Sequence, residues 1–311
     1  MISAQIEGTQ CTFDDILNPE NTQLIQRNVA DVISYVQAAE YALNRLETLP
    51  LCTRLLKEVH GILLDNTRGK EKSPGELRTS QNWIGPTGCT LNEASYIPPN
   101  LEDMADALYE LDRFINEPYE IDPIVKAALI HYQFETIHPF LDGNGRLGRL
   151  LITLSLVNDH ALSGIIFYPS YMFKLRRNEY YQSMMDVRQN GNYSQWIDFF
   201  CECLYDSALD AINSLEQLVD LRKRNTEYIT ANLGRAAING QRLLKLLEEN
   251  PICDINFIAK RLDIARTTAN NLVESFENIE ILKKVEKDKQ RYRLYMYDDY
   301  LSILRKGGEL A

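Results

Sequence analysis

The twelve residues from His138 to Arg149, HPFLDGNGRLGR, combine a histidine, a carboxylate, three glycines and two arginines. They lead into LLITLSLV, whose apolar character predicts a helix. The unpaired backbone N–H groups at a helix start attract anions, and Gly143 and Gly145 let a ligand approach the backbone closely. Arg146 and Arg149 lie three residues apart on one helix face, where each can bind phosphate oxygens. The segment therefore predicts a phosphate-binding site.

Two other side chains of this segment carry reactive groups. Asp142 places a carboxylate beside the predicted phosphate site, and Mg²⁺ commonly binds through one or two carboxylates plus substrate phosphates. The other is His138, and an unperturbed histidine has a pKa of about 6.5, which suits a general base near neutral pH. Together they predict a nucleotide polyphosphate with Mg²⁺, attacked by a hydroxyl group that His138 deprotonates. A tight turn and a solvated helix face would explain DGNG alone, but not this combination.

The segment resembles the HPFx[D/E]GNGRxxR signature of Fic-domain proteins at every specified position. The resemblance implies transfer of AMP from ATP to a Tyr, Thr or Ser hydroxyl of a target protein, with release of pyrophosphate. By the same resemblance His138 is the base and Asp142 is the Mg²⁺ ligand. The family's anion hole and phosphate-binding positions correspond to Gly143, Asn144, Gly145, Arg146 and Arg149.

Two other regions extend the resemblance. The segment PGELRTSQNWIGPTGCTLNEASYIPP predicts two short strands around a Gly-Pro-Thr-Gly turn, like the family's flap at the site entrance. A target protein would dock on it by strand addition, with Gln81, Asn82, Trp83 and Ile84 as the docking residues. The segment beginning at Tyr180 resembles the helix on the adenine side, which makes Tyr181 and Arg188 adenine contacts. Ordinary core packing explains the two tyrosines equally well.

The N-terminal sequence SAQIEG resembles the family's inhibitory pattern [S/T]xxxE[G/N]. Ser3 and Glu7 lie one helical turn apart, and the resemblance implies that Glu7 pairs with Arg149 at the γ-phosphate position. Without that context, a solvated helix face explains them as well. Only two residues precede Ser3, so a helix here is expected to fray and to inhibit incompletely if Met1 is the native start. Glu7 could instead support removal of AMP from a modified target.

Apolar residues at three- and four-residue intervals predict helices over most of the chain. We expect an all-α fold: a Fic-type helical bundle with a β-hairpin flap, followed by a winged helix-turn-helix domain. The expected divisions are 1–65, with the inhibitory motif, 66–237, the Fic catalytic core, and 238–311. His60, His131 and His160 lie in apolar-periodic helices and are interpreted as packing residues.

The region from residue 238 onward combines three short helices with a hairpin, which is typical of a winged helix. The segment from Lys283 to Arg293 is basic and could follow a phosphate backbone. Arg266, Thr267, Thr268, Asn270 and Asn271 could read bases. The alternative is a protein-docking or dimerisation module. A second functional hypothesis follows, in which the chain is a DNA-binding regulator whose Fic body senses nucleotide.

Composition narrows the remaining classes of protein. The 311 residues carry a net charge of −11, and the acid excess lies before residue 238, which disfavours nucleic acid as a partner of the main body. The sequence predicts no membrane span and no secretory signal. The six cysteines are scattered without zinc spacing, as expected for reduced thiols in the cytoplasm. Homo-oligomerisation is left open.

Overall fold

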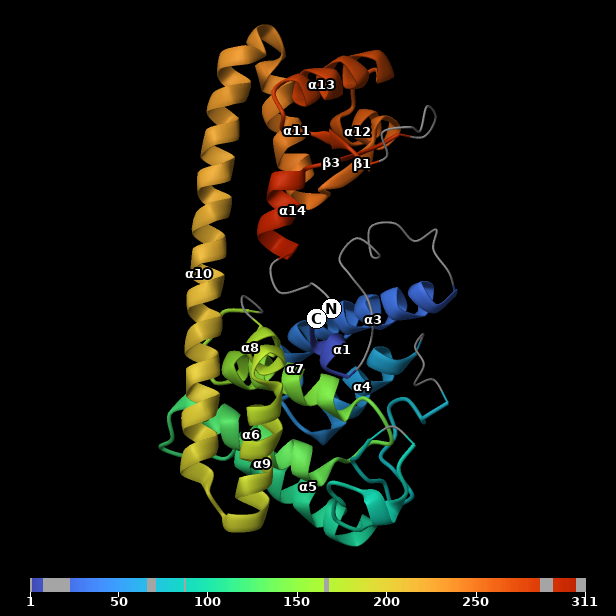
Figure 1. The fold of residues 1–311 in the computed structure, drawn as a ribbon, viewed down its shortest axis with the longest axis vertical. Coiled ribbons are helices and arrows are strands. Elements are labelled where there is room, and N and C mark those ends of the chain that lie inside the picture. Colours follow the sequence, from blue (N-terminus) through green and yellow to red (C-terminus); the bar gives the residue numbers. More distant parts are fainter. Residues whose placement is uncertain are drawn as a thin grey trace. The chain divides into compact units, whose positions relative to one another are not determined.

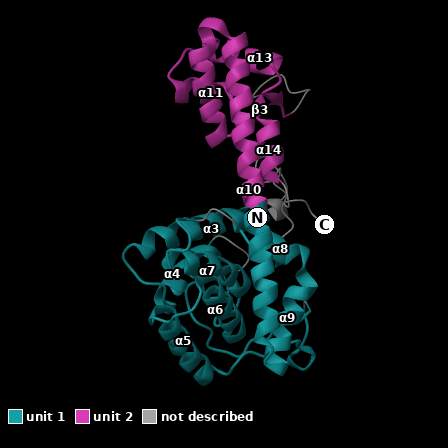
Figure 2. Cartoon of the chain, turned by 90° about the vertical axis from the view of Figure 1, so that its left-hand side faces the viewer, with its two compact units in different colours: residues 1–209, 310–311 teal, residues 210–309 magenta. Residues whose placement is uncertain are grey.

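The computed structural model describes residues 2–7, 23–65, 71–86, 88–164, 168–285 and 293–305. The chain forms two compact units, residues 1–209 with 310–311 and residues 210–309 (Figure 2). Most of the described residues are helical, as the sequence predicts. Within these ranges, no helix combines the length and the apolar character that crossing a membrane requires.

The first unit is a bundle of helices (Figure 1). Its helices are α1 (Ile2–Ile6), α3 (Gln23–Leu46), α4 (Thr53–Leu64), α5 (Leu101–Asn116), α6 (Pro123–Ile137), α7 (Asn144–Asn158), α8 (Ser170–Leu175), α9 (Arg177–Asn190) and the first part of α10 (Tyr193–Asn232). One core cluster contains buried residues of α3, α4, α5, α6 and α7. A second contains buried residues of α6, α7, α8, α9 and α10.

Helices α6 and α7 lie side by side in the centre of this unit and carry the predicted site at their junction. Helix α6 begins after Asp122, whose side chain accepts the N–H of Ile124, and Pro123 fits the first helical turn. It ends at His138, which adopts a left-handed backbone conformation with φ 49°. Helix α7 is buried from Asn144 to Leu156 except at Gly145, which is partly exposed. Such all-round burial fixes the junction between the two helices.

The predicted flap hairpin is reduced to a single antiparallel bridge between Ile84 and Tyr96. The two strands expected there do not form among the described residues, where a short 3₁₀ helix, η1 (Leu91–Glu93), occupies the return segment. Thr90 caps it by accepting the N–H of Glu93. The prolines that flank each segment explain why only one bridge forms. They lack the N–H group that a longer ladder of backbone hydrogen bonds needs. Thr87, in the expected turn, lies outside the described residues.

The second unit is small and has its own core. Beyond the end of α10 it contains η2 (Gly234–Ala236), α11 (Ala237–Glu249), β1 (Ile252–Asp254), α12 (Ile255–Leu262), α13 (Arg266–Asn278), β2 (Lys283–Lys284), β3 (Leu294–Met296) and α14 (Asp298–Arg305). The strands form an antiparallel sheet in the order β1–β3–β2, with Tyr295 opposite both Cys253 and Lys284. Strand β1 and helix α14 were not expected from the sequence. The basic tip of the predicted wing, residues 286–292, lies outside the described residues.

Candidate active site

The loop between α6 and α7 is fixed by the side chain of Asn144, which is buried. Its amide oxygen accepts the backbone N–H of Phe140 at 2.9 Å, and its amide nitrogen donates to the Phe140 carbonyl at 2.8 Å. Gly143 precedes the helix with φ 78°, a left-handed conformation that favours glycine. The loop therefore closes on itself and presents the start of α7. Asn144 contributes to the predicted anion site through this brace.

His60 on α4 also holds this loop, through its ring. Its Nδ1 accepts the backbone N–H of Gly75 at 2.9 Å, so its Nε2 donates to the carbonyl of Asp142, also at 2.9 Å. Its ring stacks on Phe140 with 3.8 Å between centroids. Burial lowers the pKa of His60 to about 4, which keeps the ring neutral. His60 is thus a packing residue, as the sequence indicated, with two specific hydrogen bonds.

His138 lies at the junction with most of its surface buried. Burial lowers its pKa to about 4, outweighing the Glu135 carbonyl and Glu7, which favour the charged ring. This value is well below the ordinary one that the sequence suggested, but it leaves the imidazole neutral and able to accept a proton. The carbonyl of His138 accepts hydrogen bonds from Arg78 at 3.1 Å and Asn82 at 3.2 Å. The flap segment therefore holds the backbone of the predicted base.

The start of α7 holds an anion supplied by the chain itself. A side chain on Gly145 would collide with the carboxyl group of Glu7, so this carboxyl lies directly against the backbone of the first helical turn. Arg149 donates to Glu7 Oε1 at 2.8 Å and to the hydroxyl and carbonyl of Ser3 at 3.0 and 2.7 Å. Burial opposes the charge of Glu7, but the Arg149 guanidinium holds its pKa below the ordinary value. Ser3, Glu7, Gly145 and Arg149 are thus brought together.

Helix α1, which carries Ser3, is formed and anchored. Ile6 is buried in the core beside α6 and α7, and Gln5 accepts a hydrogen bond from Lys174 on α8 at 2.8 Å. These contacts explain why a five-residue helix persists where fraying was expected. Gly8, the last residue of the predicted inhibitory pattern, lies outside the described residues.

Arg146 and Asp142 form the other side of the predicted phosphate-binding site. Arg146 lies 3.6 Å from Asp142 and 3.9 Å from Asp31, a buried carboxyl on α3. The side chain of Asp142 is 44% exposed, so it can accept a ligand from solvent. No cluster of three candidate metal ligands occurs in the described ranges. A single accessible carboxylate beside a phosphate cradle still fits Mg²⁺, which takes its other ligands from phosphates and water.

The two predicted adenine contacts, Tyr181 and Arg188, differ in their surroundings. Tyr181 is 37% exposed, whereas its neighbour Tyr180 is buried and donates to His131 Nε2 at 2.8 Å, which settles Tyr180 as a core residue. Arg188 lies over the ring of Tyr96, with 3.8 Å from Cζ to the centroid, and within 3.3 Å of Thr136. It therefore connects α9 to the flap.

The four predicted docking residues lie along one flap segment. Gln81 donates to the Pro98 carbonyl, and Asn82 also donates to the Phe140 carbonyl, each at 2.9 Å. Ile84 forms the bridge to Tyr96, and Trp83 is 41% exposed. The amide side chains of Gln81 and Asn82 thus fasten the flap, which leaves Trp83 as the most accessible of the four.

Sequence reasoning overlooked three residues of this site: Glu135, Arg78 and Asp31. Glu135 is buried within 3.7 Å of His138, Arg78 binds the His138 carbonyl, and Asp31 faces Arg146. Only Glu135 left a local signal, since it precedes His138 by three residues and thus shares its helix face.

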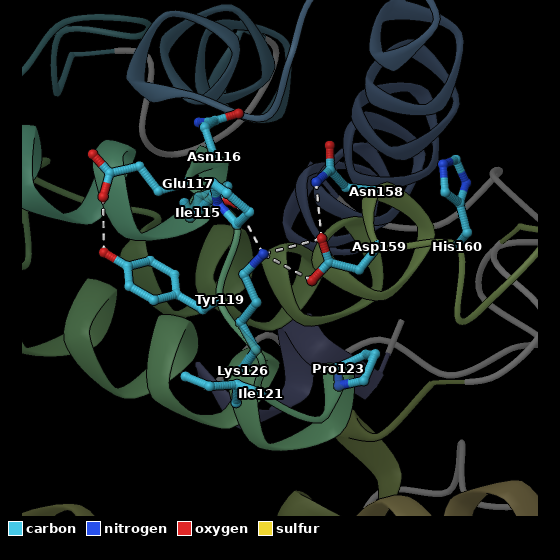
Figure 3. A pocket seen from close by; sticks show the side chains of 11 residues that line it. Ile115, Asn116, Glu117, Tyr119, Ile121, Pro123, Lys126, Asn158, Asp159 and His160 are labelled. Carbon is cyan, nitrogen blue, oxygen red and sulfur yellow. Dashed lines mark hydrogen bonds and ion pairs between the residues drawn. The ribbon is translucent and has the colours of Figure 1, made fainter.

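A cavity of about 440 Å³ lies at the N-terminal end of α6 (Figure 3). Lys126 reaches into it, donates to the Ile115 carbonyl at 2.9 Å and to Asp159 Oδ1 at 3.1 Å, and forms an ion pair with Asp159 Oδ2 at 3.0 Å. These partners lie on α5 and at the end of α7, so this lysine joins α5, α6 and α7 structurally.

Comparison with known proteins agrees with this site. Residues 50–156 match the model of the Fic/DOC family, and residues 1–44 match that of the Fic/DOC family N-terminal region. The first match contains the signature from His138 to Arg149, and the second contains Ser3 and Glu7. It is 30% identical over 131 residues to "Protein adenylyltransferase Fic" of Drosophila yakuba, covering 42% of this chain and 23% of that protein. With the Drosophila willistoni protein of the same name it shares 30% identity over 197 residues, covering 63% and 34%.

Solved structures show the same fold. A Fic family protein from Desulfovibrio desulfuricans G20 superimposes with a TM-score of 0.60 at 20% identity, covering 95% of this chain and 84% of that one. Fic-1 from C. elegans superimposes with a TM-score of 0.53 at 22% identity, covering 69% and 61%. The matched part of the chain spans 23% and 34% of the length of these two curated relatives.

Proposed function

We propose that the chain is a protein adenylyltransferase, which transfers AMP from ATP to a hydroxyl group of a target protein and releases pyrophosphate. The observation that carries the proposal is the Glu7 carboxylate lying on the start of α7 and paired with Arg149. A carboxylate held there supports the interpretation that the helix start and the arginine together favour a negative group. The names of the relatives and the match to the Fic/DOC family support the same activity.

The residues of the site divide the work of this transfer. The backbone from Gly143 to Gly145, with Arg146, would bind phosphate oxygens and stabilise the charge that develops on them. Asp142 would hold Mg²⁺, which supplies further positive charge to the phosphates when bound. His138 is neutral and would take the proton of the target hydroxyl. The hydroxyl oxygen then bonds to the α-phosphorus, and the bond from that phosphorus to the departing pyrophosphate breaks.

The target would reach this site along the flap. Ile84 already uses its backbone groups on Tyr96, so an incoming extended segment would pair with the residues before it, beside the exposed Trp83. The flap holds the His138 carbonyl through Asn82, so a hydroxyl presented there would be delivered close to the base.

Glu7 would inhibit the transfer in this arrangement. It occupies the arginine that the γ-phosphate needs, and its own charge repels phosphate. Replacing Glu7 with glycine removes both effects, so we expect labelling of the protein or its targets from α-labelled ATP to rise about tenfold or more. Glu120→Gly, in an exposed loop, is the matched control.

The decisive comparison adds His138→Ala to the Glu7→Gly background. Loss of labelling in the double variant, with the exposed His160→Ala as control, would support His138 as the base. Equal labelling in both would refute that role, and absence of labelling in Glu7→Gly itself would refute the transferase.

A further inference from the structure

Glu135 places a buried carboxyl group next to the proposed base. It lies in the last turn of α6, its residue is 6% exposed, and its Oε2 lies 3.7 Å from Nδ1 of His138. The backbone carbonyl of Glu135 also lies 3.4 Å from the same nitrogen. Both acceptors of one residue thus face Nδ1, which favours the tautomer with the proton on Nδ1 and leaves Nε2 as the basic nitrogen.

The carboxyl group occupies a notch that the sequence leaves open. A side chain on Gly148 of α7 would collide with Glu135 Oε1, so the absence of a side chain there makes the space. Oε1 is buried and has no hydrogen-bond partner among the residues described by the structure. A buried, unpaired carboxyl oxygen costs free energy, so a structural role alone gives little reason to keep it.

The charges around Glu135 come from three elements and depend on α1. Arg149 of α7 and Arg188 of α9 favour its ionised form, whereas burial and Glu7 oppose it, and Tyr180 of α9 also lies within its field. Burial, the largest effect, raises its pKa to about 7. Departure of Glu7 removes a like charge and frees Arg149, so the carboxyl would ionise when the site opens.

We infer that Glu135 is a positioning residue for the proposed transfer, whose carboxylate holds the Nδ1–H of His138 and stabilises the imidazolium formed when Nε2 takes the hydroxyl proton. The inference rests on the proposed function. The proton moves from the target oxygen to Nε2 and the Nδ1 proton stays in place, while the new imidazolium pairs with Glu135. A histidine oriented by a buried carboxylate works in this way in acyl transfer.

A direct test measures the pKa of His138 by NMR in full-length protein with labelled histidines, assigned with His138→Ala. In the Glu7→Gly background, adding Glu135→Gln should lower the His138 pKa by about one unit or more, because it removes an opposite charge at close range. Glu110→Gln, an exposed glutamate on α5, should leave it unchanged. A His138 pKa that is the same with and without Glu135→Gln would overturn the inference.

The kinetic test uses the same variants. We expect Glu135→Gln to lower kcat about tenfold or more with the KM for ATP unchanged, and Glu135→Asp to retain part of the activity. If Glu7→Gly protein has the same kcat with and without Glu135→Gln, the positioning role is overturned. The transferase proposal would still stand in that case, because the Glu7→Gly protein is active. If Glu135→Gln does not fold, Gly148→Ala displaces the same carboxyl group and should lower the His138 pKa, and an unchanged pKa there would refute the positioning role.

Discussion

At the residue scale, the site depends on side chains that hold the reacting groups in place. Asn144 closes the loop, His60 fixes the Asp142 carbonyl, and Asn82 fixes that of His138. All three bind backbone groups, so the loop is fixed before any ligand arrives. Such preorganisation is what makes donors at a helix start effective for a developing charge.

Asn144→Ala should destabilise the protein and weaken nucleotide binding. It removes both hydrogen bonds to the Phe140 backbone and leaves the buried Phe140 N–H unsatisfied, at a cost of about 2 kcal/mol, while Asn82 still donates to the Phe140 carbonyl. Urea unfolding and ATP titration measure the two effects. Asn158→Ala, at the other end of α7, is the control, and wild-type affinity for ATP in Asn144→Ala would contradict the bracing role.

The residues in the signature could be predicted because the reacting groups are contiguous in sequence. Their supports could not, since Arg78 binds a carbonyl sixty residues away and His60 one that is eighty-two residues away. The sequence shows these side chains in helical or turn-rich segments, where packing is the default interpretation. Glu135 is the exception, because it lies one helical turn from the histidine it faces.

At the scale of elements, α1 is short but held at several points. Ile6 inserts into the core, Gln5 meets Lys174, and Ser3 and Glu7 meet Arg149. The fraying expected for a helix of this length neglects these tertiary contacts, which supply the stability that local propensity lacks. The flap shows the reverse, because turn residues predicted a hairpin and the prolines limited it to one bridge.

Ile6→Ala should activate the protein without changing any residue that faces ATP. It removes the apolar anchor of α1, a change of about 2–5 kcal/mol for a buried isoleucine, and so shifts α1 toward the undocked state. Labelling from α-labelled ATP should rise above the wild-type level. Leu175→Ala on α8, which is 62% exposed, is the control. Labelling that stays at the wild-type level would argue against α1 docking as the source of inhibition.

At the scale of the whole molecule, three buried histidines make stability depend on pH. Burial lowers the pKa values of His60 and His138 to about 4 and of His131 to about 3. Below pH 6.5 these three histidines bind protons in the unfolded chain but stay neutral in the folded protein. The free energy of unfolding therefore falls as the pH falls. Glu135 acts oppositely, because its pKa of about 7 makes the folded state bind a proton first.

We therefore expect the free energy of unfolding to fall by roughly 2 kcal/mol per pH unit between about pH 6 and 5, since three imidazoles outweigh one carboxyl. Thermal and urea unfolding at several pH values measure this slope. Glu135→Gln should make it steeper, and His131→Gln should make it shallower. Stability that is flat or rises toward pH 5 would be incompatible with neutral, buried imidazoles.

The left-handed backbone at His138 has an evolutionary consequence. A residue with a Cβ atom pays roughly 1–2 kcal/mol for this conformation, and glycine does not. Selection for stability alone would thus favour glycine at the end of α6. The imidazole at this position therefore comes with a cost in stability that glycine would not have, as expected where a residue serves the reaction and not the fold.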